Sequence, residues 1–323
     1  MYAAMQRIGP QVHCVVASGG NAGQAAARTA KELGVKCTVH VHLHTEQGIV
    51  DRIEAWGATV KRAQGAWIQA NKAALAMARD DPNGVYIHPF EGDDLVLGHT
   101  CIVDEMYDDI PEVSKESGEP TDHPDVITVA VGGGGLLRGV MLGGYERALE
   151  QGTPSPHVVA VSTIGGDFFS QSLWTEDEFV EVEDPFSLAK SLVCKSGSPI
   201  AVRDGRYYAK NGQLSLDIGE TKGKAGPYLT ALSVDDARAG SAAWQATDEL
   251  GTMIELSTGA ALAPAQNKCV LDWLVREKNL SQKLNVVVIV CGGTRVDLEE
   301  VEKHRLYGQG SGKIIADGHV IAE

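Results

Sequence analysis

The sequence has no closely spaced pair of cysteines, and this absence excludes two classes of protein. Its six cysteines are scattered singly, so neither a zinc knuckle nor a disulfide framework is indicated. Basic residues are also scarce, because 28 lysines and arginines stand against 43 aspartates and glutamates. The resulting net charge of −15 argues against nucleic-acid partners and anionic membranes, and no apolar run reaches spanning length. With no signal peptide in view, we expect a cytoplasmic protein without nucleic-acid or membrane partners.

Three signatures of catalysis or nucleotide binding are missing as well. There is no Gly-x-Ser-x-Gly, which disfavours an α/β-hydrolase. The four consecutive glycines Gly132, Gly133, Gly134 and Gly135 are not followed by Gly-Lys-Ser/Thr, so they do not form a Walker loop. No acidic residue ends a following strand about 20 residues later, as a dinucleotide fingerprint requires.

These glycines are nevertheless the most informative stretch of the chain. They follow the apolar, β-branched run Val126–Val131, which predicts a buried parallel strand, and they precede a helix-compatible segment, 136–149. Backbone N–H groups of glycines can converge on one anion, and the helix behind them adds the favourable end of its dipole. The pattern predicts a phosphate cradle. A plain strand-to-helix turn is the alternative interpretation.

Two further loops follow predicted strands. Ser18-Gly-Gly-Asn-Ala-Gly23 lies between a predicted strand, Val12–Ala17, and a predicted helix. Asn21 there either caps the helix or, with Ser18 and free backbone N–H groups, binds a carboxylate. Cys291 ends a third strand and is either inert packing or part of a site. Ligands of open α/β sheets bind at the carboxyl ends of strands, so we expect these loops to line one cofactor pocket.

The remaining chain alternates predicted strands and helices, which indicates α/β lobes with mostly parallel sheets. We expect a small lobe over residues 1–93 and a large lobe over residues 94–323. His40, His42 and His44 alternate along one predicted strand. They form either a metal site or a polar face of that strand. Other expectations are a Thr45 helix cap, a surface connection over Pro111–Pro124, one helix over Ala260–Lys278 and a last buried strand over Asn285–Val290.

Three motifs resemble a known fold, in the same order along the chain. Ala17-Ser-Gly-Gly-Asn-Ala-Gly-Gln-Ala-Ala-Ala27 is similar to the asparagine loop of pyridoxal-phosphate enzymes with the tryptophan-synthase β-like fold (fold type II). Val129–Leu137 resembles their phosphate loop, and Val288–Gly293 their pyridine-nitrogen site. Within that fold the resemblance is to the catabolic L-serine/L-threonine dehydratases (ammonia-lyases), which Ala55–Lys61, Val85–Phe90, Gly98-His99 and Ser187–Lys190 also resemble.

The resemblance implies a role for each matching residue. Asn21 would bind the 3′-oxygen of pyridoxal 5′-phosphate, and Ser18, Gly19, Gly20 and Asn21 would hold the substrate carboxylate. Gly132 to Leu136 would wrap the phosphate, and Cys291 would face the ring nitrogen. A thiol does not favour a protonated pyridinium, so the ring is a weaker electron sink, which suits β-elimination. Racemases of this fold place a serine base where Gly19 stands, so Gly19 also favours elimination.

The chain departs from the family at three places. Where the family has a cation-binding glutamate, this chain has Ser162, which puts the monovalent or divalent cation in doubt. Thr294-Arg295 replace the family's usual Ser-Asn. The lysine that forms the Schiff base lies in a Ser-x-Lys-x-Arg-Gly motif that would fall before Met1, and Lys31 stands in the wrong unit. We therefore expect a chain that is truncated at its N-terminus and has no catalytic lysine.

The resemblance implies elimination of water from serine, giving pyruvate and ammonia, and from threonine, giving 2-oxobutanoate and ammonia. Its partners would be an amino-acid substrate and a second copy in a homodimer. The alternatives are a catalytically dead or regulatory relative, because the lysine is absent, and a β-replacement enzyme of the cysteine-synthase type.

Overall fold

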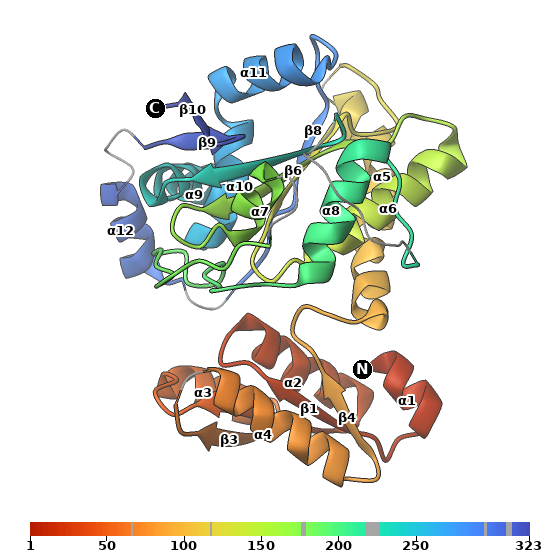
Figure 1. Ribbon diagram of the computed structural model, residues 1–323, viewed down its shortest axis with the longest axis vertical. Helices are drawn as coiled ribbons and strands as arrows, with labels where there is room; N and C mark the ends of the chain where they lie inside the picture. The colour runs from red at the N-terminus through yellow and green to blue at the C-terminus, as the bar shows by residue number, and fades with distance from the viewer. Residues whose placement is uncertain (66, 117, 176–178, 218–226, 294–295, 308–311) are drawn as a thin grey trace. The chain divides into compact units, whose positions relative to one another are not determined.

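The protein folds into two compact units, Met1–Asp94 and Leu95–Glu323, each built around one β-sheet. The computed structural model describes residues 1–65, 67–116, 118–175, 179–217, 227–293, 296–307 and 312–323. In both units the sheet is covered by helices (Figure 1), so the predicted α/β class with mostly parallel sheets is confirmed. Among the described helices, none combines the length and apolar character that crossing a membrane requires.

The first unit has a four-stranded sheet in the order β3-β2-β1-β4, and all of its neighbours are parallel. Its strands are β1 (His13–Ala17), β2 (Lys36–His42), β3 (Thr59–Ala63) and β4 (Gly84–Ile87). Its helices are α1 (Tyr2–Ile8), α2 (Asn21–Leu33), α3 (Gln47–Ala55) and α4 (Trp67–Asp80).

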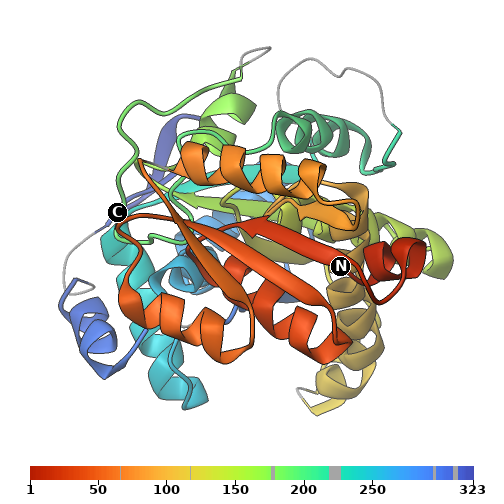
Figure 2. The same ribbon diagram turned by 90° about the horizontal axis from the view of Figure 1, so that it is seen from below.

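Both faces of the central strand β1 are buried, because all five of its residues lie in the interior. On β1, Cys14 and Val16 pack with residues of α2 and α3, whereas Val15 and Ala17 pack with Ala74 and Ala78 of α4. Figure 2 shows α4 on one side of the strands and α2 and α3 on the other. Successive side chains of a strand point to opposite faces, which explains why one short strand serves both cores.

The second unit has a six-stranded sheet in the order β10-β9-β7-β6-β5-β8. Strands β7, β6, β5 and β8 are parallel, whereas β9 is antiparallel to both of its neighbours. The strands are β5 (Val126–Ala130), β6 (His157–Thr163), β7 (Leu229–Val234), β8 (Val286–Val288), β9 (Ile314–Ala316) and β10 (His319–Ala322). The helices are α5 (Asp93–Glu116, which starts in the first unit), α6 (Gly135–Gln151), α7 (Phe168–Trp174), α8 (Pro199–Asn211), α9 (Asp236–Leu250), α10 (Leu256–Ala265), α11 (Lys268–Lys278) and α12 (Leu298–Tyr307).

Two apolar cores lie on the two faces of this sheet. Val126 and Ala130 of β5 belong to the core that α9, α10 and α11 cover. Ile127 and Val129 belong to the core that α5, α6, α7 and α8 cover. β5 therefore lies between two helical layers, and the glycine run follows its carboxyl end.

The edges of both sheets are short, charged or irregular. β8 has three residues and β10 has four, with a register shift between Val320 and Ala322. At one edge of the first sheet, β3 carries Lys61 and Arg62.

Several local predictions were wrong. α5 continues through Pro111 to Glu116 instead of ending before it, because a proline removes one hydrogen bond without forcing a helix to stop. The expected helix over Ala260–Lys278 is two helices, α10 and α11, and Asn267 caps the second by accepting hydrogen bonds from the N–H groups of Cys269 and Val270. Glu46, not Thr45, occupies the N-cap position of α3, and strands β9 and β10 follow the strand that was expected to be last.

Candidate active site

The first predicted loop is a strand-to-helix turn within Met1–Asp94. β1 ends at Ala17, Ser18 and Gly19 turn the chain, and Gly20 occupies the N-cap position of α2, which starts at Asn21. The Gly20 N–H donates to Ser18 Oγ at 3.3 Å. Ser18 to Asn21 are half-buried. The turn thus presents backbone N–H groups and two polar side chains at the positive end of a 13-residue helix.

Gly19 lies against a buried threonine in this turn. A Cβ at position 19 would lie 2.7 Å from Thr45 Oγ1, so a larger side chain has no room. Thr45 Oγ1 itself is buried and has no hydrogen-bond partner among the described residues. The sequence had suggested Thr45 only as a helix cap, whereas its hydroxyl lies beside Gly19.

The second loop is the glycine run of the other unit. Gly132 and Gly133 follow β5, and Gly134 occupies the N-cap position of α6 with a φ of 98°. Side chains rarely adopt this conformation, and a Cβ on Gly134 would lie 2.4 Å from the Cβ of Ala201. The first turn of α6 carries no acidic residue. The geometry and the charge are those of an anion-binding turn.

A second helix starts beside this turn. Ser198 caps α8, accepting a hydrogen bond from the N–H of Ala201, and its own N–H donates to Gly133 O at 3.0 Å. A Cβ on Gly197 would lie 2.9 Å from the same Gly133 oxygen. The glycine run is thus fixed from the side by the start of α8.

A buried ion pair joins the two helices. Arg138 of α6 and Asp204 of α8 are 2% and 0% exposed, and Arg138 Nε lies 2.7 Å from Asp204 Oδ2. The other Asp204 oxygen accepts hydrogen bonds from Arg203. The backbone N–H of Arg138 donates to Gly134 O, so the ion pair lies in the helical turn that follows the glycine run.

Cys291 lies three residues beyond β8, which ends at Val288, and so does not itself end a strand as the sequence had suggested. β5 and β8 are parallel neighbours, with Thr128 paired to Val288, so Cys291 and Gly132 leave the same edge of the sheet. Cys291 and Leu136 both pack against the core on that face. Burial raises the pKa of the Cys291 thiol, and the Glu255 carboxylate raises it further, so the thiol is neutral at physiological pH.

Glu255 is a residue that the sequence had not singled out. It is 6% exposed at the N-cap position of α10, and Ser191 Oγ and Ser257 Oγ donate to its Oε2 at 2.9 and 3.2 Å. A Cβ on Gly293 would lie 1.7 Å from Glu255 Oε1, so the loop after Cys291 lies directly on this carboxylate. A glutamate before a run of small residues was the available signal, but Ser191 and Gly293, which lie against it, are distant in sequence.

The remaining predicted residues are three histidines, Ser162 and Thr294-Arg295. His40 and His42 belong to β2, whereas His44 lies beyond its end. Within the described residues, no group of three or more histidines, cysteines, aspartates or glutamates is placed to hold a metal ion. Ser162, at the doubtful cation position, is fully buried and donates to Val131 O at 3.3 Å. Thr294-Arg295 lie outside the described residues.

Comparison with known proteins identifies the class that this fold and these loops define. Residues 1–292 match the pyridoxal-phosphate dependent enzyme family, and the chain belongs to it. Mouse "serine dehydratase-like" is 33% identical over 296 residues, covering 91% of this chain and 79% of that protein. Human "L-serine dehydratase/L-threonine deaminase" is 31% identical, covering 90% and 78%.

A solved structure agrees with this assignment. A fungal L-serine ammonia-lyase from Rhizomucor miehei superposes with a TM-score of 0.69 and 26% identity, covering 94% of this chain and 85% of that one. The fold class and the resemblance to the serine and threonine dehydratases are therefore confirmed, and pyridoxal phosphate is the cofactor of the family. The glycine run fits the phosphate of that cofactor, because a Cβ would fill the space at Gly134 and no acidic residue lies in the first turn of α6.

Proposed function

We propose that this protein catalyses the β-elimination of L-serine to pyruvate and ammonia, with L-threonine as a second substrate that gives 2-oxobutanoate. The main support for this proposal is the similarity to a serine dehydratase-like protein over nine-tenths of the chain. We further propose that a small domain, residues 1–93, carries the asparagine loop, that residues 94–323 carry the phosphate loop, and that the protein acts as a cytoplasmic homodimer.

Each loop would hold one part of the reactants. Backbone N–H groups of Gly132 to Leu136, at the start of α6, would bind the phosphate of the cofactor. Ser18 and the N–H groups of Gly19, Gly20 and Asn21 would bind the substrate carboxylate, and the Asn21 amide would bind the 3′-oxygen of the cofactor. The half-buried position of Ser18 to Asn21 leaves these groups able to meet a small ligand.

Two residues would direct the outcome of the reaction. Pyridoxal phosphate supplies an electron sink when bound. The neutral Cys291 thiol would face its ring nitrogen and, unlike a carboxylate, would not hold a proton there. A Cβ added at position 19 would lie 2.7 Å from Thr45 Oγ1, so this position has no room for the serine that acts as a base in racemases. Both features favour elimination over racemisation.

The role of Cys291 gives a first test. Cys291→Ser keeps a neutral hydrogen-bonding group and is expected to retain elimination activity, whereas Cys291→Ala is expected to lower it. Pyruvate formation from L-serine is measured with a chain that also carries the lysine motif. Cys269→Ser, at an exposed cysteine, is the matched control. Equal rates for all variants would show that Cys291 serves only in packing.

The cofactor-binding lysine decides between the proposed enzyme and a dead or regulatory relative. The 323 residues contain no Ser-x-Lys-x-Arg-Gly before the asparagine loop, and that lysine is also the natural base for the substrate α-proton. We expect pyruvate from a chain that includes such a segment. Both chains are assayed with L-serine, L-threonine and added cofactor, and then treated with borohydride for peptide mapping.

Three results would count against this proposal. A stoichiometric cofactor adduct on a lysine of the 323 residues, with pyruvate formed, would refute the need for the added motif. No activity from either chain would support the regulatory alternative. Formation of a cysteine-type product from an activated serine and sulfide, without pyruvate, would support a β-replacement enzyme.

A further inference from the structure

A separate pocket lies at the amino ends of the parallel strands of the second unit. Asp125 precedes β5, His157 begins β6 and Tyr228 precedes β7, whereas the glycine run follows the opposite end of β5. The pocket, here called the amino-end pocket, has a volume of about 260 Å³. Pockets for drug-sized ligands have roughly 300–1,000 Å³, so this one suits a smaller molecule. The residues that matter for its chemistry are His123, Asp125, Ser155, His157, Tyr228 and Lys278.

Lys278 brings a positive charge that the protein leaves largely unsatisfied. Its side chain is only 12% exposed, yet its ammonium makes no hydrogen bond within the described part of the chain. Its contacts there are Asp317 Oδ2 at 3.7 Å and the face of the Trp273 ring at 5.4 Å. An ammonium has three donors, and buried donors are normally paired. The pocket therefore offers a cation to an incoming acceptor.

His157 does not add to this positive charge. It is 2% exposed, and both ring nitrogens are engaged, Nδ1 with Pro227 O at 2.7 Å and Nε2 with Thr230 Oγ1 at 2.9 Å. Burial lowers its pKa to about 4, and the nearby Lys278 ammonium lowers it as well. The imidazole is thus a neutral wall of the pocket.

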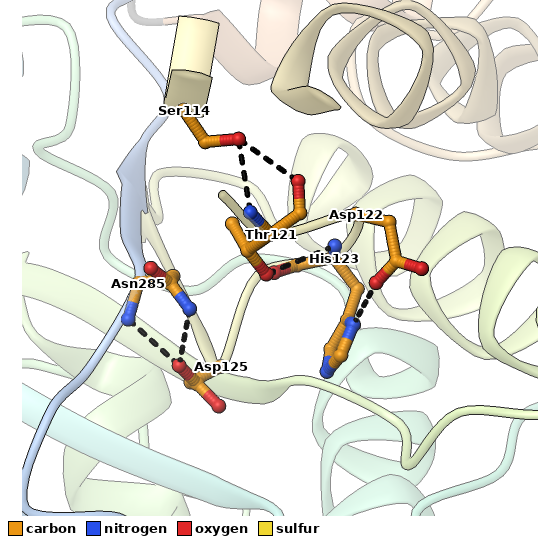
Figure 3. A network of polar contacts seen from close by, with 6 residues as sticks. All are labelled: Ser114, Thr121, Asp122, His123, Asp125 and Asn285. Atoms are coloured by element: carbon orange, nitrogen blue, oxygen red, sulfur yellow. Dashed lines mark hydrogen bonds and ion pairs between the residues drawn. The ribbon is translucent and has the colours of Figure 1, made fainter. Parts of the chain in front are cut away.

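Asp125 brings the opposite charge. Its Oδ2 accepts hydrogen bonds from Asn285 N at 2.7 Å and Nδ2 at 3.0 Å. The other oxygen, Oδ1, points away from Asn285 in Figure 3 and accepts no hydrogen bond from any described residue. The segment before Asp125 is held in place, because Ser114 bonds Thr121 and His123 bonds Asp122 (Figure 3). Asp125 is therefore a positioned carboxylate with capacity for a donor.

We infer that the amino-end pocket binds a free α-amino acid, whose carboxylate meets Lys278 and whose ammonium meets Asp125. A small zwitterion is the ligand that satisfies both charges at once. Inorganic phosphate would be repelled by Asp125, and a simple amine by Lys278. Ser155 and Tyr228 add hydroxyl groups to the same lining. The inference does not rest on the proposed elimination reaction.

The test is calorimetric titration of the full chain with glycine, acetate, methylammonium and inorganic phosphate. Glycine is expected to bind more tightly than the other three. Lys278→Met and Asp125→Asn are each expected to weaken glycine binding about tenfold or more, as the loss of a hydrogen bond to a charged group implies. Gly19→Val, whose side chain would collide with Thr45 in the proposed carboxylate loop, is expected to leave glycine binding unchanged and so separates this pocket from the proposed active site.

Two controls guard against misfolding. Lys283→Met removes a surface lysine that pairs with Glu119, and it should leave binding unchanged. Asp317→Asn removes the competitor of the ligand for Lys278, so it should preserve or strengthen binding even if Lys278→Met fails to fold. The inference would be overturned by tighter binding of phosphate than of glycine, by no glycine binding at all, or by glycine binding that survives both Lys278→Met and Asp125→Asn.

Discussion

Replacing Gly134 with alanine is expected to weaken binding of pyridoxal phosphate about a hundredfold or more. A φ of 98° is costly for any side chain, and the new Cβ would lie 2.4 Å from the Cβ of Ala201. Left-handed backbone costs roughly 1–2 kcal/mol, and overpacking costs a further 1–3 kcal/mol. Relief of this contact requires the start of α8 or the glycine run to move, and each displaces the N–H groups that would bind phosphate. The affinity is measured by equilibrium dialysis and by the phosphorus NMR signal of the bound cofactor.

The same helix supplies a control for backbone strain. Gly152, at the C-cap of α6, has a φ of 68° and no atom within 4 Å of its would-be Cβ. Gly152→Ala therefore introduces comparable strain without touching the cradle, and it should lower stability slightly while leaving cofactor affinity intact. If both variants bind the cofactor as the parent does, the glycine run is only a turn. Equal weakening in both would point to a general effect on α6.

Breaking the buried ion pair is expected to destabilise the second unit by about 3–5 kcal/mol. Arg138→Met removes one partner of the fully buried Asp204 carboxylate and with it the 2.7 Å bond from Arg138 Nε. Since Arg138 follows the glycine run by one helical turn, cofactor affinity should fall together with stability. Denaturant unfolding followed by circular dichroism measures the first effect, and dialysis the second.

The double variant Arg138→Met/Asp204→Leu separates charge from packing. It removes both buried charges, so it should be more stable than Arg138→Met alone, because an unpaired buried charge costs more than a missing pair. Arg28→Met removes a solvent-exposed partner of Glu32 on α2 and should change stability little. A double variant less stable than Arg138→Met would mean that Asp204 is held by Arg203 and not by Arg138.

The sequence predicted those features that depend on neighbouring residues. The apolar run of β5, the glycines and the following segment predicted a strand, a turn and a helix, and all three elements are present. Anion binding at the helix start stays a prediction. Asn21 was expected near the start of a helix as its possible cap, but α2 already begins at Asn21 and Gly20 occupies the N-cap position. In each case a few consecutive residues fix the local backbone, which is why short motifs suffice.

Features that depend on distant contacts escaped prediction. β7 was missed because Thr230 and Ser233 interrupt its apolar run, although both hydroxyls are bonded inside the fold, to His157 and Asp167. Glu255 acquires its position through Ser191 and Gly293, far away along the chain. In the sequence, nothing distinguishes Asp204 from an ordinary helical residue, because its partner Arg138 lies on a different helix, α6. Their surroundings exist only in the folded molecule.

The edges of the two sheets bear on how copies of this protein can associate. An exposed edge strand invites addition of a strand from another chain, and proteins resist this with short strands, irregular register and charges. β8 and β10 have three and four residues, β10 is out of register near its end, and β3 presents Lys61 and Arg62. Intermolecular sheet extension is thus disfavoured at these edges, which also lowers the tendency toward fibrous aggregation. We expect copies of the chain to meet through helical surfaces instead.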